Sequence, residues 1–153
     1  MAEFHIRTAK QQDLPRLLAL YTHLHEDEPL LEIDRRVAEL WDGILANPWL
    51  YNMMGEVDEE LVSSCTLTLV PNLTRSALPY GLIENVVTHP DHRKKGYATA
   101  VLRHALQVAW GHGCYKVMLL TGSKQEETLR FYENAGFKRG VKTGFIAYPQ
   151  TGG

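Results

Sequence analysis

Three consecutive basic residues followed by a glycine stand between a predicted strand and a predicted helix. The basic residues are Arg93, Lys94 and Lys95, and Gly96 lets the backbone approach a ligand closely as the helix begins. The first turn of a helix carries unpaired N–H groups and a partial positive charge, which suit phosphate oxygens. The segment is therefore a candidate pyrophosphate site. The alternative is a solvated charge run with a glycine that only the turn requires.

The elements on either side of this segment are predicted from residue patterns. The strand spans Leu82 to Thr88, and a polar loop follows from His89 to Lys95. The helix begins at Gly96 or Tyr97, because apolar residues then recur at the i, i+3, i+4 and i+7 spacing. Those residues are Ala98, Val101, Leu102, Ala105, Val108 and Ala109. The segment matches neither G-x-x-x-x-G-K-[ST] nor G-x-G-x-x-G.

Glu84 is a carboxylate in an otherwise apolar strand, where burial without a partner or a purpose is costly. In a regular strand it shares a face with Val86 and Thr88, whereas Asn85 points to the opposite face. A carboxylate at this position can remove a proton from an amine, directly or through a water molecule. A structural ion pair is the alternative for Glu84, and Asn85 is interpreted as a structural hydrogen-bonding residue.

The chain resembles the GNAT superfamily of N-acetyltransferases. The order Arg93-x-x-Gly96-x-Ala98, after a strand that ends in Thr88-His89-Pro90, is similar to the R/Q-x-x-G-x-G/A signature of that superfamily. In those enzymes the loop and the helix start surround the pyrophosphate of acetyl-CoA. The resemblance implies that acetyl-CoA is the cosubstrate. The implied binding residues here are Arg93, Lys94, Lys95, Gly96, Tyr97, Ala98 and Thr99.

A second resemblance to the superfamily lies in Phe131-Tyr132-Glu133-Asn134-Ala135-Gly136-Phe137, which is similar to F-Y-E-x-x-G-F. The tyrosine of that segment lies near the sulfur of CoA, so the resemblance implies that Tyr132 protonates the leaving thiolate or donates a hydrogen bond to it. Taken alone, the segment is also consistent with a packed aromatic pair before a capping glycine. An asparagine often precedes this tyrosine by one or two helical turns, and the matching position here is Gln125.

The resemblance also implies a bulge in the strand that contains Glu84. In GNAT enzymes the bulge leaves backbone groups free, so that pantetheine pairs with them and a backbone N–H contacts the thioester carbonyl. Those backbone positions fall at Val86, Val87 and Thr88. With Glu84 and Tyr132 as catalytic residues, the implied activity is direct acetyl transfer to a primary amine of a small molecule. This is an acyltransferase reaction that transfers groups other than aminoacyl groups.

A narrower resemblance concerns the acceptor. Ile83-Glu84-Asn85-Val86-Val87 and Gly113-Cys114-Tyr115-Lys116 are similar to the E-D-V-V and G-C-Y-K segments of glucosamine-6-phosphate N-acetyltransferases. The aspartate that those enzymes carry in the next strand falls on Leu120, and their E-D pair becomes Glu84-Asn85. Both departures remove acidic groups tied to the sugar site. Acetylation of protein lysines or N-termini and a non-catalytic acyl-CoA-binding module are further alternatives, although the pair Glu84 and Tyr132 favours an enzyme.

The composition is that of a globular protein of 153 residues, with 16 Lys and Arg against 18 Asp and Glu. The net charge of −2 argues against sequence-independent binding to nucleic acid. No apolar run approaches the roughly 20 residues of a membrane span, and the first residues lack the apolar core of a signal peptide. Cys65 and Cys114 form neither a disulfide framework nor a zinc pattern. We therefore expect a cytoplasmic protein without a metal.

The patterns across the chain predict one α/β (α+β) domain over residues 1–153, with the element order βααβββαβαββ. A crossover helix after Gly96 implies a parallel strand pair beside an antiparallel meander, in a mixed central sheet flanked by helices. This order matches the GNAT fold. The predicted strands are Phe4–Arg7, Trp49–Glu56, Leu61–Val70, Leu82–Thr88, Tyr115–Thr121, Phe137–Arg139 and Phe145–Tyr148, and the other predicted helices are Leu14–His25, Asp34–Ala46 and Glu126–Ala135. Because the last two strands leave a sheet edge to protect, and many GNAT enzymes pair through sheet edges, we expect a homodimer.

Overall fold

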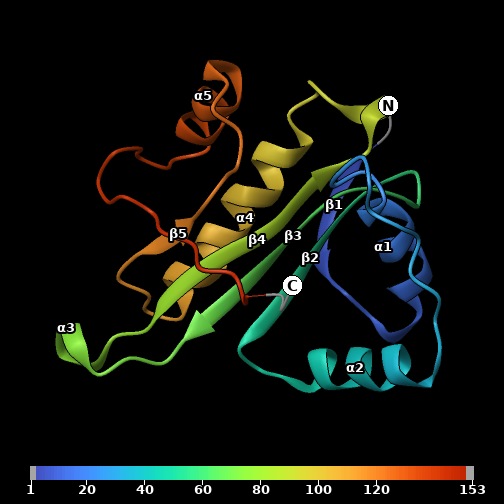
Figure 1. The fold of residues 1–153 in the computed structure, drawn as a ribbon, viewed down its shortest axis with the longest axis horizontal. Helices are drawn as coiled ribbons and strands as arrows, with labels where there is room; N and C mark the ends of the chain where they lie inside the picture. The colour runs from blue at the N-terminus through green and yellow to red at the C-terminus, as the bar shows by residue number, and fades with distance from the viewer. Residues whose placement is uncertain (1–2, 151–153) are drawn as a thin grey trace.

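The computed structural model describes residues 3–150 and contains a five-stranded mixed sheet with helices on both faces (Figure 1). The strands lie side by side in chain order, and only the last pair is parallel. They are β1 (Phe4–Thr8), β2 (Leu50–Val57), β3 (Glu60–Val70), β4 (Tyr80–Thr88) and β5 (Val117–Leu119). Within these described residues, no helix has both the length and the apolar character needed to cross a membrane.

The helices divide between the two faces of the sheet and enclose two hydrophobic clusters. Helices α1 (Leu14–Tyr21) and α2 (Arg35–Ala46) cover one side, which we call the α1–α2 face. Helices α4 (Tyr97–Gly111) and α5 (Glu126–Asn134) cover the other side, the α4–α5 face. The first cluster contains Leu14, Leu17, Leu18, Leu20, Val37, Trp41, Met54, Leu61 and Val87. The second contains Met53, Cys65, Leu67, Leu69, Ile83, Val101, Leu102, Ala105, Ala109, Cys114 and Ala135.

Local sequence signals predict several element boundaries correctly. Asp34 caps α2 through its carboxylate, which accepts a hydrogen bond from the backbone N–H of Val37 at 2.9 Å. Gly96 precedes α4 in the left-handed conformation, and Gly136 follows α5 in a similar one. The predicted loop between β3 and β4 contains only α3 (Thr74–Ala77), a single turn with left-handed residues. Short 3-10 helices occupy Gln11–Asp13 and Pro90–His92.

The two predicted C-terminal strands, Phe137–Arg139 and Phe145–Tyr148, are wrong, because the described residues form no strand after β5. The fifth strand is also shorter than the predicted Tyr115–Thr121. The C-terminal segment runs over the surface with its apolar side chains in solvent, and Phe145 is 90% exposed. Alternating apolar residues are only one of the conditions for a strand. A strand also needs a neighbouring backbone and a covered face, and residues 3–150 provide neither for this segment.

A buried carboxylate ties the beginning of α1 to the edge of the sheet. The side chain of Asp13 is 1% exposed and accepts hydrogen bonds from both terminal nitrogens of Arg7, at 2.6 and 2.9 Å. Arg16 and the backbone N–H of Lys10 donate to it at 2.8 and 2.7 Å. Both arginines also contact Glu56 on β2. The hydrogen bonds from Arg7, followed by those from Arg16 and Lys10, hold the pKa of Asp13 well below its usual value.

We expect Asp13→Asn to lower the free energy of unfolding at pH 7 by about 2–3 kcal/mol, because Arg7 loses the carboxylate that pairs with it. A carboxyl group with a depressed folded-state pKa contributes stability above its unfolded pKa of about 3.9 and loses it as the pH falls toward the folded value. The difference between the wild type and the variant should therefore shrink below about pH 4. Urea unfolding of both proteins at several pH values measures this difference in the free energy of unfolding. The exposed Asp27→Asn is the control, and a difference that does not depend on pH contradicts the prediction.

Candidate active site

Strand β4 is interrupted by a bulge at Asn85. Glu84 pairs with Thr66 on β3, and Val87 pairs with Ser64, so two residues of β4 lie opposite one residue of β3 between these pairs. Asn85 has a φ of 55°, in the left-handed region that asparagine tolerates better than most residues. The bulge that the sequence resemblance implies is therefore present in this strand.

Strands β4 and β5 separate just before the bulge. Their pairing joins Gly81, Leu82 and Ile83 to Val117, Met118 and Leu119. Beyond Ile83, the edge of β4 that faces away from β3 has no strand partner among residues 3–150. The backbone groups along this edge, from Glu84 to Thr88, are therefore accessible to a bound ligand that can pair with them.

The bulge decides which face of the sheet Glu84 occupies. Glu84 lies directly opposite Thr66, whose side chain lines a cavity on the α1–α2 face together with that of Asn85. Val86 instead packs against the cluster on the α4–α5 face. The expectation that Glu84 shares a face with Val86, and that Asn85 points away from Glu84, is therefore wrong. The extra residue in β4 interrupts the alternation on which that expectation depends.

Tyr132 lies on α5, half-buried against the α4–α5 cluster. Its ring packs edge-on against Phe131 and Phe137, with centroid distances of 4.9 and 6.4 Å. Burial raises the pKa of Tyr132, and the nearby Cys65 and Glu84 raise it further. The phenol is therefore protonated at neutral pH and can donate a proton or a hydrogen bond.

The start of α4 leaves open space for an anion. Gly96 has a φ of 83° and forms no side-chain cap. A Cβ atom at this position would have no described heavy atom within 4 Å. The space beside Gly96 is therefore open, and the first N–H groups and the dipole of α4 favour a negative charge at this end of the helix. This arrangement fits the pyrophosphate that the sequence predicts.

The basic residues before α4 are exposed and lie beside the start of α5. Arg93 donates from Nε to the carbonyl oxygen of Thr88 at 3.2 Å, which ties the guanidinium to the end of β4. Lys94 lies 3.9 Å from Glu127 in the first turn of α5, and both side chains are exposed. Lys95 is exposed as well. The structure thus gathers the three predicted cations around the open start of α4.

The other predicted cofactor-binding residues differ in what they offer a ligand. Tyr97 stacks on Phe4 of β1 at a centroid distance of 4.5 Å, so its ring takes part in packing. Ala98 and Thr99 follow in the half-buried first turn of α4. Gln125 precedes α5 as an exposed N-cap whose side chain makes no capping hydrogen bond.

Neither cysteine has the properties of a nucleophile. Both thiols are free and buried. Burial raises the pKa of Cys65 to about 12, and burial also raises the pKa of Cys114. Because the thiolate is the reactive form, both side chains are inert at neutral pH. This agrees with the interpretation of Cys114 as a small buried residue.

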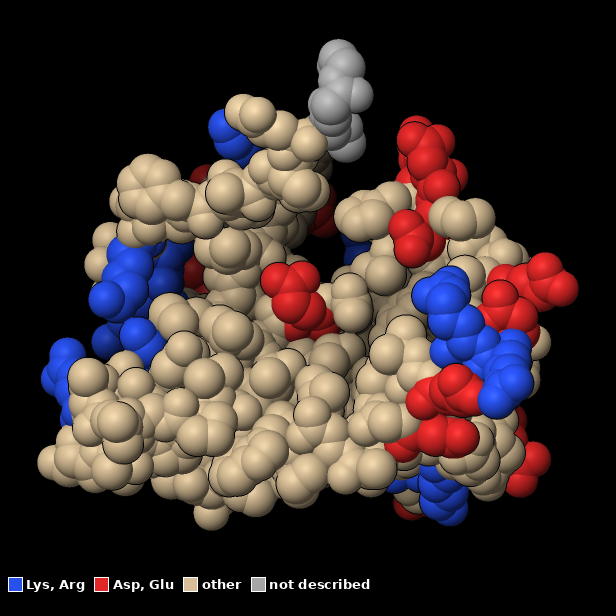
Figure 2. Space-filling view, turned by 60° about the horizontal axis from the view of Figure 1, so that its bottom comes forward, with Lys and Arg blue, Asp and Glu red and all other residues tan. Residues whose placement is uncertain are grey.

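A cavity of about 270 Å³ lies between the sheet, α1 and α2, and we call it the Asn85 cavity. Its polar lining residues Tyr21, Asn52 and Thr66 come from three separate elements, and the hydroxyl of Thr66 donates to the amide oxygen of Asn52 at 3.0 Å. Sequence reasoning missed these three residues, although Asn52 stands out as an amide in an apolar strand. Figure 2 shows the surface hollowed between the α1–α2 side and the C-terminal part of the chain, with acidic atoms at the centre of the hollow.

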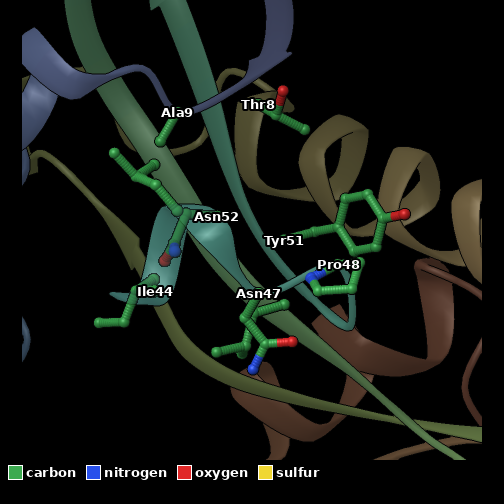
Figure 3. A pocket seen from close by; sticks show the side chains of 9 residues that line it. Thr8, Ala9, Ile44, Asn47, Pro48, Tyr51 and Asn52 are labelled. Atoms are coloured by element: carbon green, nitrogen blue, oxygen red, sulfur yellow. The ribbon is translucent and has the colours of Figure 1, made fainter. Parts of the chain in front are cut away.

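A second cavity of about 250 Å³ lies at the end of α2 and is shown in Figure 3. Its lining residues are Thr8, Ala9, Ile44, Leu45, Asn47, Pro48, Leu50, Tyr51 and Asn52. None of them is a predicted site residue. The lining of the Asn85 cavity contains no predicted site residue either, but it includes Asn85, the neighbour of Glu84 in β4.

Comparison with known proteins defines the class of this protein. The sequence pattern of the acetyltransferase (GNAT) family matches residues 14–137, and the chain belongs to that family. A glucosamine 6-phosphate N-acetyltransferase of Trypanosoma brucei brucei is 30% identical over 143 residues, which cover 90% of this chain and 91% of the relative. The protein is therefore an N-acetyltransferase, and its family uses acetyl-CoA.

Solved structures share the same fold. An acetyltransferase from Agrobacterium tumefaciens strain C58, whose name specifies no substrate, is 42% identical with a TM-score of 0.89, over 95% of this chain and 99% of that chain. An acetyltransferase from Clostridium acetobutylicum, solved with acetyl-CoA, is 21% identical with a TM-score of 0.73, over 95% and 96% of the two chains. At that identity the second likeness concerns the fold alone.

We expect Gly96→Asp to abolish binding of acetyl-CoA, because the substitution puts a side chain and a negative charge into the open space before α4. A non-glycine residue is strained at this φ, so a control must carry the same strain. Gly113→Asp provides it, since Gly113 has a φ of 81° and equally open surroundings beyond the other end of α4. Calorimetric titration of both variants measures the effect. Wild-type affinity in Gly96→Asp, or equal loss in both variants, contradicts the prediction.

Proposed function

We propose that the protein transfers the acetyl group of acetyl-CoA directly to a primary amine of a small molecule. The observation that carries this proposal is the bulge at Asn85, located where β4 leaves β5. On one side of the bulge lies the open, basic start of α4. On the other side lies the Asn85 cavity, which has room for a small acceptor. The two substrates can therefore meet at the unpaired edge of β4.

The binding of acetyl-CoA is assigned to the end of β4 and the start of α4. Acetyl-CoA supplies the acyl group as a thioester. The first-turn N–H groups of α4, with Arg93, Lys94 and Lys95, hold its pyrophosphate. The unpaired edge of β4 from Val86 to Thr88 hydrogen-bonds the pantetheine, and a backbone N–H from this edge stabilises the negative charge that develops on the thioester oxygen.

The chemical step is assigned to Glu84 and Tyr132. Glu84 accepts a proton from the ammonium group, directly or through water, which frees the nitrogen lone pair for attack on the thioester carbon. The new C–N bond forms as the C–S bond breaks. Tyr132 donates its proton, or a hydrogen bond, to the departing sulfur. The nitrogen loses its second proton as the amide forms, and this proton restores the phenol of Tyr132 through solvent. The proton held by Glu84 passes to solvent.

The acceptor is proposed to be an amine other than glucosamine 6-phosphate. The Trypanosoma brucei brucei relative carries the name of that activity, and the strand around Glu84 resembles such enzymes. However, Leu120 and Asn85 stand where those enzymes carry aspartates. The residues that line the Asn85 cavity within the described chain also include no Lys or Arg to pair with a phosphate.

We expect Glu84→Gln to reduce turnover by about 10²–10⁴-fold, most strongly at low pH, where the amine is mostly protonated. Raising the pH should partly restore the rate by supplying the free amine. Tyr132→Phe should reduce turnover toward the lower end of that range with little change in acetyl-CoA affinity, because only a hydroxyl is lost and a thiol is already a fairly acidic leaving group. A CoA-release assay with a panel of small amines, run across pH, measures both effects.

The controls for this experiment are Glu59→Gln, in the exposed β2–β3 turn, and Tyr80→Phe, at the other end of β4. Both should keep the wild-type rate and pH profile. An unchanged pH profile in Glu84→Gln would show that a water chain or another group removes the proton, so that Glu84 is structural.

We also propose that the protein is a cytoplasmic homodimer in which a second copy covers the exposed C-terminal segment, residues 141–148. This segment presents several apolar side chains to solvent, and β5 beside it has a free edge. An extended segment and an unpaired edge can satisfy each other between two copies. The two buried free thiols are consistent with a reducing compartment.

We expect the wild type to sediment as a dimer at micromolar concentration and Phe145→Asp to sediment as a monomer, because a charge in an apolar interface is costly. Leu73→Asp is the control, since Leu73 is equally exposed but lies in the loop before β4. A wild-type protein that sediments only as a monomer contradicts the proposal.

A further inference from the structure

We infer that the acceptor is a primary amine with an apolar body, such as an alkylamine or arylalkylamine, held in the Asn85 cavity with its amino group at the bulge. This inference rests on the proposed function, because it assumes that acetyl transfer takes place beside Glu84. It adds the class of substrate. Three properties of the cavity support the inference. Most of its wall is apolar, its end next to β4 is polar, and the charged residues around it are acidic.

The wall formed by α1 and α2 is apolar except for Tyr21, the last residue of α1. Leucines of both helices line it, with Trp41 and Ile44 of α2. The one polar atom of the Trp41 side chain, Nε1, donates to the carbonyl oxygen of Gln11 at 3.1 Å, so the ring presents carbon atoms to the cavity. Leu31 and Leu40 continue the apolar surface to the rim, where both are exposed. Hydroxyl groups of a sugar would find no partners along the apolar part of this wall.

The opposite end of the cavity, next to β4, is polar. It contains Asn52, Thr66 and Asn85, together with Tyr21 from α1. The hydroxyl of Thr66 and the amide oxygen of Asn52 bond to each other. The side chain of Asn85 forms no hydrogen bond within the described part of the chain, and its amide oxygen can accept one from an ammonium group. An amine with an apolar body therefore binds in one orientation. Its apolar body lies along the leucines, and its amino group lies at the polar end, beside Glu84.

The charge around the cavity favours a cation. Glu28 is the only charged residue among the described lining residues. Glu26 and Asp27 precede it in the same exposed segment. This surface attracts an ammonium group and repels a phosphate. The volume of about 270 Å³ admits roughly ten non-hydrogen atoms, at about the 30 Å³ that a water molecule occupies in the liquid.

The inference is tested by the CoA-release assay with straight-chain primary amines from ethylamine to octylamine, with 2-phenylethylamine, and with ethanolamine and glucosamine 6-phosphate. We expect kcat/KM to rise about fourfold for each added CH₂ group until the cavity is filled. A series without this rise, or a higher kcat/KM for glucosamine 6-phosphate than for the best alkylamine, overturns the inference and leaves the proposed function intact.

A binding measurement separates failure of the inference from failure of the proposed function. Calorimetry on the protein saturated with CoA should detect 2-phenylethylamine and should not detect glucosamine 6-phosphate at the same concentration. If 2-phenylethylamine binds and no amine releases CoA, the cavity assignment stands and the proposed catalytic function fails. If neither binding nor turnover is found with any apolar amine, the inference is overturned.

A matched pair of variants then locates the site. Leu40→Lys puts a cation at the apolar rim, and the fold should tolerate it because Leu40 is 54% exposed. We expect kcat/KM for 2-phenylethylamine to fall about tenfold or more, through charge repulsion and lost apolar contact. Leu73→Lys adds the same charge at a leucine that is 91% exposed and lies outside the cavity, and it should have no effect. With folding checked by circular dichroism, equal effects of the two variants, or none, overturn the inference.

Discussion

The extra residue in β4 is the constraint on which the proposed site depends. Because Asn85 takes a left-handed conformation, Glu84 and Asn85 both lie on the α1–α2 face, while Val86 lies on the other. The bulge falls just after β4 has lost its pairing with β5, so the same few residues combine an unpaired backbone edge with a change of face. In a regular strand, Glu84 and Val86 would share one face.

The rest of the fold keeps this interruption in place. Strand β3 pairs with β4 on both sides of the bulge, and each of its faces packs against one of the two hydrophobic clusters. Helix α4 crosses the sheet on one face, which holds its open start beside the end of β4 (Figure 1). On the other face, the hydrogen bonds of Asp13 join α1 to β1 and β2. The packing of these elements against one another therefore holds the proposed site rigid.

Opposite charges at the two ends of the site separate the proposed substrates. The three cations before α4 stand at the end that suits a pyrophosphate, and an acidic segment ending in Glu28 borders the cavity on the other side. Each end attracts one substrate and disfavours the other. The phenol of Tyr132 on α5 stays protonated mainly because burial raises its pKa. This arrangement would let both substrates bind without competing for one subsite.

Features that depend on a few neighbouring residues were predictable from the sequence alone. The cap at Asp34, the glycine before α4, the main helices and the first four strands follow from side-chain hydrogen bonds, φ preferences and apolar spacing, which act within a turn or a strand. The family motifs likewise predicted the bulge. Only the tertiary structure decided the face of Glu84, the polar end formed with Tyr21 and Asn52, and the absence of strands after β5 within the described residues. These three features depend on which strands and helices lie next to each other. Such contacts join residues that are distant in sequence.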